Sequence, residues 1–175
     1  MPSHLLAILH SLPVGSGVRT LRRVEIAQQA LGCRSSSIVN VFPAVLPDSN
    51  ALNDEVSTDT FDRGRELIRQ ALDLEATSDV LLAYGIQLPT GANRLAYRAQ
   101  IDWISGELAS RSVRVWSFGG RPAHPSRWHR VVSREHPGSS VEARAAEFLV
   151  RHDLRPKLTG VSNPIDTIML SSERD

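Results

Sequence analysis

Cysteine and lysine are almost missing from this chain of 175 residues, and each shortage excludes something. The single cysteine, Cys33, rules out an internal disulfide, a Cys-rich zinc site and a cysteine-ligated iron–sulfur cluster. The single lysine is Lys157, so the other basic residues are arginines, whose planar guanidinium suits bidentate contacts with phosphate. A GC-rich genome also produces arginine-rich proteins, so this bias alone does not identify a ligand.

Long apolar runs are missing too. No segment approaches the length of a membrane-spanning helix, so we expect no membrane partner. The apolar residues 5–9 are too few for a signal peptide and follow no lysine or arginine, which favours a cytoplasmic protein. The length suits one domain, expected over residues 1–152. The polar tail at 153–175 has an apolar island at 165–170 that adds an edge strand or stays loosely docked.

Several enzyme motifs are absent as well. The chain has no G-x-S-x-G nucleophile elbow, and residues 15–17 lack the full spacing of a P-loop or a dinucleotide fingerprint. His124, His129 and His136, even with Cys33, follow no standard metal-ligand spacing. We therefore expect neither a metal nor another cofactor.

Charge is balanced overall but not along the chain. Lys plus Arg is 20 and Asp plus Glu is 19, so net charge does not indicate a partner. From Arg94 to Arg134, however, arginines outnumber the two acids, Asp102 and Glu107. This basic section favours an anionic partner.

Apolar runs and helical periodicity alternate along the chain. Four apolar segments indicate strands, at residues 5–9, 37–42, 79–85 and 113–116. Four segments with apolar residues at helical spacing indicate helices, at residues 19–31, 59–74, 93–110 and 140–151. Thr20 or Ser16 is expected to cap the first helix. We expect an α/β fold, a three-layer α/β/α sandwich with a central, mostly parallel four-stranded sheet.

Parallel strands place their carboxyl ends at one edge of the sheet, where open α/β proteins bind ligands. Three loops are expected to meet there, at residues 9–17, 40–53 and 118–128. In the last loop, Gly119 and Gly120 allow unusual backbone angles, while Pro122 and Pro125 hold His124 extended. Such a stiff loop presents a ligand-binding histidine, or it is an ordinary turn with solvated side chains.

Two residues of the second strand are candidates for binding a nucleobase. Asn40 interrupts an apolar run in which asparagine is unusual. Its amide has a donor and an acceptor, which can recognise the edge of a base or bond to nearby loop backbone. Phe42 can stack on a base or belong to the core.

Two further segments are candidates for contacts with nucleic acid. Gly15, Ser16 and Gly17 precede a helix, whose backbone N–H groups can bind an anion. Trp128, beside Arg127, can stack on or wedge into nucleic acid, or it can pack on the last helix.

The order of these motifs resembles the uracil-DNA glycosylase superfamily. Its bacterial and archaeal iron–sulfur branch has a base-recognising strand similar to Ile38-Val39-Asn40-Val41 followed by Pro47, Asn50 and Asp54-Glu55. Residues 80–85 resemble a strand of that branch that ends in glycine. Ala123-His124-Pro125-Ser126-Arg127 resembles its His-Pro-Ser motif.

A little-characterised bacterial and phage family of the same apparent fold is more similar still. The similarity covers about residues 5–135 and depends on the order of short motifs. These are Arg22-Arg23, Asn40-Val41-Phe42-Pro43, Tyr84-Gly85 and Pro122-Ala123-His124-Pro125.

The resemblance implies a uracil-DNA glycosylase-like fold and a nucleobase-recognising, DNA-binding protein. The implied reaction is hydrolysis of the N-glycosidic bond of a modified or damaged base. His124 would be the catalytic residue, because it would stabilise the charge that grows on the departing base. The base-binding residues would be Asn40, Phe42 and His10. The DNA- or phosphate-binding residues would be Gly15, Ser16, Gly17, Ser126, Arg127 and Trp128, with Trp128 near the position of a wedge that fills the gap left by a flipped nucleotide.

The chain departs from that family after its first strand. Active members carry an acid or an asparagine there to activate water, whereas this chain has His10-Ser11-Leu12-Pro13 and no Asp or Glu before Glu25. The cluster cysteines are absent as well. Two alternatives therefore stay open: a non-catalytic nucleic-acid or nucleotide-binding module, and a small-molecule nucleoside or nucleotide hydrolase.

Overall fold

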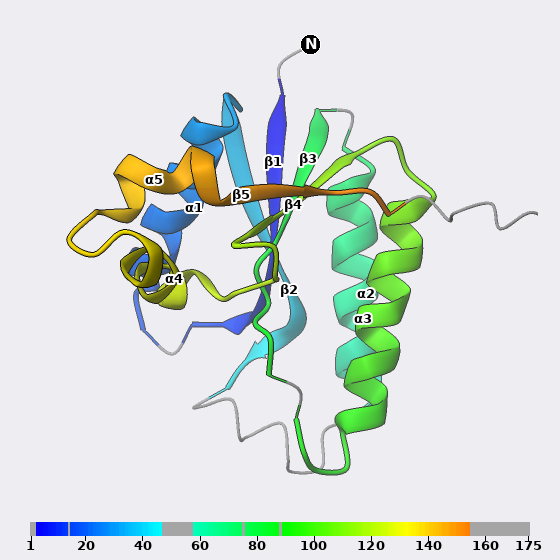
Figure 1. The fold of residues 1–175 in the computed structure, drawn as a ribbon. Helices are drawn as coiled ribbons and strands as arrows, with labels where there is room; N and C mark the ends of the chain where they lie inside the picture. The colour runs from blue at the N-terminus through cyan, green and yellow to red at the C-terminus, as the bar shows by residue number, and fades with distance from the viewer. Residues whose placement is uncertain (1–2, 14, 47–57, 75, 88, 155–175) are drawn as a thin grey trace, which may run out of the picture.

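The sheet has five strands in the order β2-β1-β3-β4-β5, one more than expected from the sequence. A computed structural model describes residues 3–13, 15–46, 58–74, 76–87 and 89–154 (Figure 1). The strands are β1 (His4–Leu12), β2 (Ser35–Val45), β3 (Thr77–Leu82), β4 (Arg114–Phe118) and β5 (Leu149–His152). The first four are parallel to one another, and β5 pairs antiparallel with β4.

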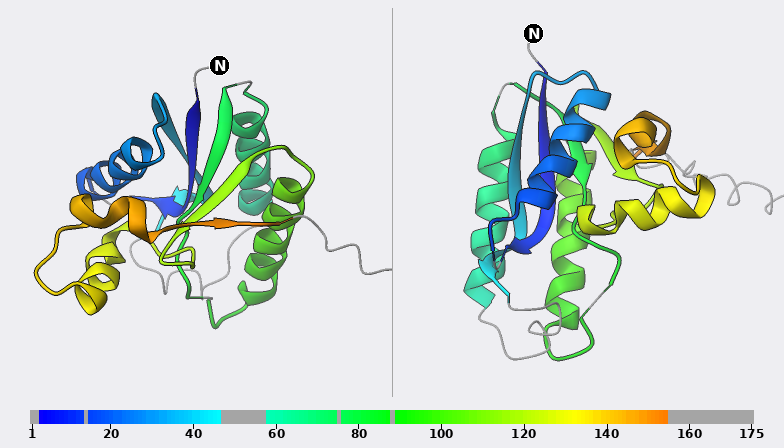
Figure 2. Two further views of the ribbon diagram at one scale, coloured as in Figure 1. Left: turned by 45° about the horizontal axis from the view of Figure 1, so that its top comes forward. Right: turned by 90° about the vertical axis from the view of Figure 1, so that its left-hand side faces the viewer.

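Helices cover both faces of this sheet, which gives an α/β fold with three layers (Figures 1 and 2). One face is covered by α1 (Val18–Ala30), α4 (Trp128–Glu135) and α5 (Val141–Phe148). The other face is covered by α2 (Thr58–Leu72) and α3 (Arg94–Ala109). Among the described residues, no helix is long and apolar enough to cross a membrane.

The strand β1 divides the hydrophobic core into two parts. Leu5, Ala7 and Leu9 pack with the layer of α1, α4 and α5, whereas Leu6 and Ile8 pack with the layer of α2 and α3. All five side chains are buried, as alternation along a strand with two covered faces requires. The continuous apolar run at the start of the sequence is therefore an interior strand of a two-sided core.

The carboxyl-terminal end of the described chain differs from the expected helix over 140–151. The side chain of Ser140 accepts a hydrogen bond from the N–H of Ala143, and α5 ends at Phe148. Residues Leu149–His152 then form the antiparallel edge strand β5. Pairing with the free edge of β4 outweighs local helix propensity here, and the Ser117 hydroxyl and His152 Nε2 lie 2.6 Å apart across the pair.

Two other local expectations are corrected. The short helix α4 was not expected, because its apolar positions are few among charged residues. The first helix is preceded by Gly17 at φ 62°, and neither Ser16 nor Thr20 caps it with a side-chain hydrogen bond. The expected loop at 40–53 begins only after Val45, and its residues 47–53 lie outside the described chain, as does the apolar island at 165–170.

The strand β2 is fixed in place by a close approach of α2. A Cβ atom on Gly64 would lie 2.5 Å from the carbonyl oxygen of Val41. The fully buried amide of Gln100 donates hydrogen bonds to the carbonyl oxygens of Val41 and Phe61. These contacts hold the middle of β2, next to Asn40, against the helical layer.

Candidate functional site

A cavity of about 1050 Å³ opens where the parallel strands end. The connection β1-α1-β2 lies on one face of the sheet and β2-α2-β3 on the other, so β1 and β3 flank the point at which the winding reverses. Open α/β sheets bind their ligands at such a point. The cavity is lined by residues of β1 and β2, of the segment after β3, of the loop after β4 and of the start of α1.

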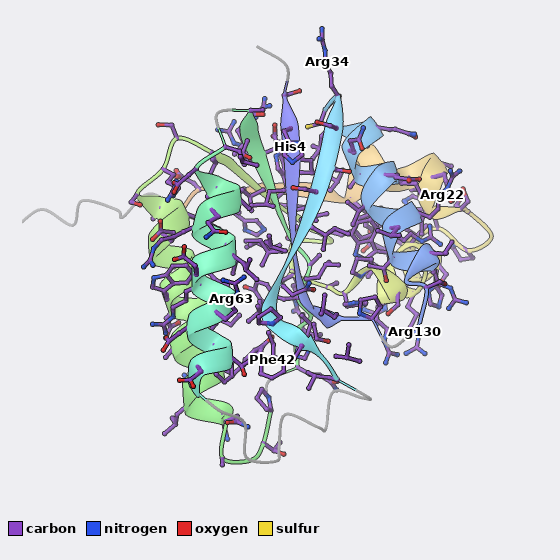
Figure 3. The ribbon with its side chains drawn as sticks, turned by 180° about the vertical axis from the view of Figure 1, so that it is seen from behind. His4, Arg22, Arg34, Phe42, Arg63 and Arg130 are labelled. Carbon is purple, nitrogen blue, oxygen red and sulfur yellow. The ribbon has the colours of Figure 1, made fainter. Side chains whose placement is uncertain are left out.

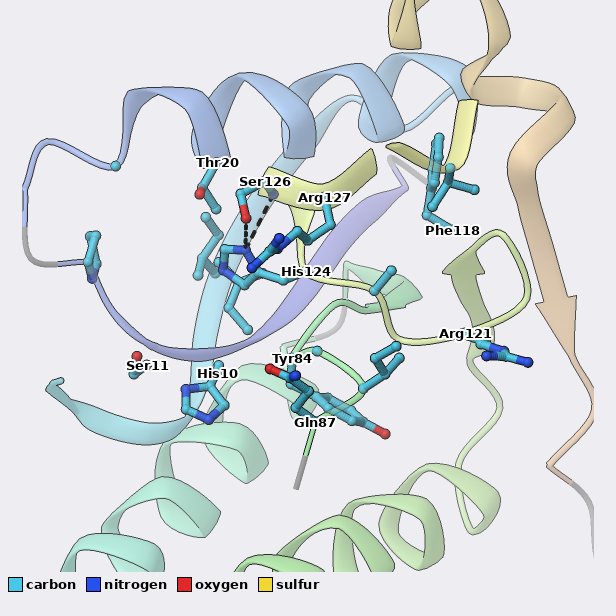
Figure 4. Close-up of a pocket in the computed structure, with 18 of the residues that line it drawn as sticks. His10, Ser11, Thr20, Tyr84, Gln87, Phe118, Arg121, His124, Ser126 and Arg127 are labelled. Carbon is cyan, nitrogen blue, oxygen red and sulfur yellow. Dashed lines mark hydrogen bonds between the residues drawn. The ribbon is translucent and has the colours of Figure 1, made fainter. Parts of the chain in front are cut away.

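His124 lines this cavity from the loop after β4 (Figure 4). Gly119 and Gly120 at the start of the loop have φ angles of 68° and 73°, which glycine adopts readily. Further along, the carbonyl oxygen of Pro122 accepts a 2.6 Å hydrogen bond from the N–H of Gly85, which joins this loop to the segment after β3. The glycines and prolines of the sequence therefore place the imidazole at the sheet edge.

The tautomer of His124 follows from its hydrogen bonds with Ser126. Its Nδ1 accepts from the Ser126 backbone N–H at 3.3 Å, and the Ser126 hydroxyl lies 2.9 Å from the same nitrogen. Burial lowers the pKa of His124, and the positive charge of Arg127 lowers it further. The ring is therefore neutral near pH 7 and carries its proton on Nε2, which makes it a hydrogen-bond donor without charge.

Asn40 lines the same cavity from β2. Its side chain is 8% exposed, and within the described residues its Oδ1 atom has no hydrogen-bond partner. A buried polar atom left without a partner costs roughly 1–3 kcal/mol. A ligand N–H group that reached this buried oxygen would satisfy it.

His10 is a second neutral imidazole in the cavity, at the end of β1 (Figure 4). Burial lowers its pKa, and a positive charge on His124 would lower it further. Its ring lies 5.6 Å from the ring of Tyr97, whose buried hydroxyl also has no hydrogen-bond partner among the described residues. Burial raises the pKa of Tyr97 and of Tyr84, so both hydroxyls stay protonated.

The candidate phosphate-binding residues are brought only partly together. Ser16 and Gly17 line the cavity before the first turn of α1, whereas Gly15 is not one of the lining residues. Ser126 and Arg127 line it too, although the Ser126 hydroxyl already contacts His124.

Two expected ligand contacts are wrong. Phe42 is 3% exposed and packs edge-on against Phe61, so it belongs to the core and does not stack on a bound base. Trp128 has no exposed surface, stacks on Phe118 at 4.2 Å between ring centroids, and donates its indole N–H to the carbonyl oxygen of Ala123. It cannot act as a wedge in nucleic acid, but it anchors the loop that carries His124.

Several other residues line the cavity. Arg130, which the sequence places beside Trp128 and Arg127, lines it from α4. Arg134 of α4 and the exposed apolar Leu12 and Ile86 line it too, and these three were not candidates from the sequence. The spacing of Arg127, Arg130 and Arg134 by three and four residues is a helical signal, but α4 was not recognised as a helix. The leucine and isoleucine gave no signal, because single exposed apolar residues are common.

The cavity is poor in acidic groups. Within the described chain, Glu135 of α4 is its acidic lining residue. No three His, Cys, Asp or Glu side chains in the described ranges come together in a group that could hold a metal ion. Apart from Glu135, the polar side chains of the described lining are therefore imidazoles, amides, hydroxyls and guanidiniums.

Comparison with protein-family models, with curated proteins and with solved structures gives no significant match to this chain.

Proposed function

We propose that this protein binds a nucleobase of DNA in the cavity and hydrolyses the N-glycosidic bond of that base. One observation carries the proposal: Asn40 and His124, which lie 84 positions apart (124 minus 40), line one cavity. A uracil-DNA glycosylase-like fold is part of the same proposal. It is supported by the parallel strands β1 to β4 between two helical layers and by a binding cavity at their carboxyl ends.

The two side chains complement the edge of a base. The unpartnered Oδ1 of Asn40 needs an N–H donor, and the Nε2–H of His124 needs an acceptor. Bases that carry an N–H group beside a carbonyl, such as uracil or hypoxanthine, offer both. The volume of about 1050 Å³ exceeds what one base requires, so the cavity also has room for a sugar and a phosphate.

The neutral imidazoles suit the proposed reaction. As the bond between C1′ and the base nitrogen breaks, its electron pair moves onto the base, and the Nε2–H of His124 donates a hydrogen bond to the oxygen that gains this charge. Water adds to C1′, and the neutral ring of His10 accepts the proton that the water releases. Low pKa values keep both rings in the required neutral form near pH 7.

A non-catalytic nucleobase-binding module is the second candidate, and one observation favours it. Among the described residues, the cavity's acidic side chain is the exposed Glu135 on the surface of α4, whereas the family that the sequence resembles activates water with an acid or an asparagine after the first strand. In that case the cavity binds the same bases without releasing them.

Oligonucleotides that each contain one uracil, hypoxanthine, xanthine or oxidised pyrimidine test these candidates. Alkali cleaves at an abasic site, so strand cleavage after incubation reports hydrolysis, while fluorescence anisotropy reports binding. The His124→Ala variant should lose hydrolysis, and His129→Ala, which replaces an exposed histidine of α4, should keep it. Binding without abasic product would support the second candidate, and neither binding nor product would contradict both.

A further inference from the structure

One side of the cavity carries a row of arginines. Arg127, Arg130 and Arg134 lie at the start of α4 and along it, and all three line the cavity. Spacings of three and four residues put them on one face of the helix, over about 10 Å of its axis. At about 3.4 Å per nucleotide, that is the length of roughly three nucleotides of one strand.

These guanidiniums are available to an anion. Within the described residues, none of the three has an ion-pair partner, in contrast to Arg22, Arg23 and Arg144, which pair with glutamates. Arg127 is also close enough to His124 to lower the pKa of that ring. The arginine row therefore begins beside His124 and continues along α4.

The rim formed by the ends of β1 and β3 has a different character. Its exposed lining residues include Leu12, which is 40% exposed, and Ile86, which is 60% exposed. Apolar side chains contact the faces of unstacked bases favourably, but they do not compensate for the desolvation of a phosphate. The described cavity thus has three arginines along α4 for one sugar-phosphate backbone, and apolar groups with the single Arg121 on its other side.

We propose that the nucleic acid bound here is single-stranded, with its backbone along the arginine row of α4 and its bases turned toward the cavity and its apolar rim. This inference rests on the proposed recognition of a nucleobase and adds the form of the substrate. Beyond the arginine row, the described lining offers a second backbone a single guanidinium, that of Arg121 after β4, beside the apolar Leu12 and Ile86.

Binding of fluorescein-labelled oligothymidylate of about ten nucleotides, and of its duplex with oligoadenylate, tests the inference by anisotropy. We expect the single strand to bind at least about tenfold more tightly than the duplex. With three phosphate contacts, log K should fall against log salt with a slope of about −2, and Arg130→Ala and Arg134→Ala should each reduce its size by about 0.7.

The control is Arg63→Ala on α2, across the sheet from α4, which should leave the slope unchanged (Figure 3). Circular dichroism verifies that each variant is folded. Duplex binding as tight as single-strand binding would overturn the inference, and so would an unchanged slope in the Arg130→Ala/Arg134→Ala double variant.

Binding of deoxyuridine and deoxyinosine separates this inference from the proposed function. Both nucleosides lack phosphate, so the arginine variants should bind them as the unaltered protein does. Nucleoside binding combined with a preference for duplex would refute the single-strand inference alone. Failure of the unaltered protein to bind any nucleoside would instead count against the proposed function.

Discussion

Ser126 holds the ring of His124 through its backbone N–H, which donates to Nδ1 at 3.3 Å (Figure 4). A backbone donor cannot act as an acceptor, so this bond leaves the proton of the neutral ring on Nε2. The Ser126 hydroxyl adds a second contact with the same nitrogen at 2.9 Å. The loop thus provides a fixed donor toward the cavity.

Replacing Ser126 by alanine separates these two contacts. The backbone bond remains, so the tautomer should be retained, while loss of one side-chain hydrogen bond costs about 0.5–1.5 kcal/mol of positioning. We expect roughly a three- to tenfold loss in kcat/KM or in affinity for base-containing DNA. A loss as large as that of His124→Ala would mean instead that the hydroxyl contacts the ligand itself.

Base binding should weaken on acidification. The pKa values of His10 and His124 lie below the ordinary 6.5, because burial opposes the charged form. Both rings are therefore neutral at pH 7 and take up protons only as the pH falls below 6.5 through the lowered values. Titration of the two rings by NMR, together with affinity at each pH, should give the same midpoint; activity that persists below both pKa values would contradict these roles.

Acidification below pH 6.5 should lower the stability of the fold as well as base binding. Between the lowered folded pKa values and 6.5, the unfolded chain binds more protons than the folded chain, so stability increases with pH. The double variant His10→Gln/His124→Gln should show a flatter dependence. Chemical denaturation at several pH values measures both proteins.

We expect Asn40 to lower the stability of the fold while it contributes to base binding. Its Oδ1 has no partner among the described residues, so the Asn40→Leu variant removes a buried unsatisfied acceptor at similar volume. We expect the free energy of unfolding to rise by about 1 kcal/mol and base binding to be lost. A strong destabilisation would mean that the amide is a structural residue.

Two glycines in helices give a matched test of the contact between α2 and β2. Gly64→Ala places a Cβ atom 2.5 Å from the carbonyl oxygen of Val41 and should destabilise the fold by about 1–3 kcal/mol. Gly106→Ala in α3 has no atom within 4 Å of the new Cβ atom, so higher helix propensity should stabilise by about 0.5–1 kcal/mol. Thermal unfolding compares the two, and equal effects would contradict the contact.

Most of the sheet, and the edge at which the cavity lies, could be predicted from the sequence. Continuous apolar runs identify β1 and β3, because a strand covered on both faces buries successive apolar side chains. The alternation of strands and helices then brings Asn40 and His124 to one edge without knowledge of any contact. These inferences depend on periodicity and connectivity, which are local properties of the chain.

The remaining features depend on tertiary contacts. The strand β5 forms because β4 offers a free edge to residues that alone favour a helix. Phe42 and Trp128 were candidates for stacking on bases because an aromatic side chain looks the same in the sequence whether it binds a ligand or fills the core. Their contacts with Phe61 and Phe118 in the folded chain show that both side chains belong to the core.

The proposed recognition of one base by Asn40 and His124 is tested most directly by NMR, with deoxyuridine and deoxyinosine as probes. The side-chain amide of Asn40 and the Nε2–H of His124 are observed in one titration. We predict that both signals shift with the same midpoint, because one planar ring contacts both groups. A response of neither group, or of only one of them, would contradict the account.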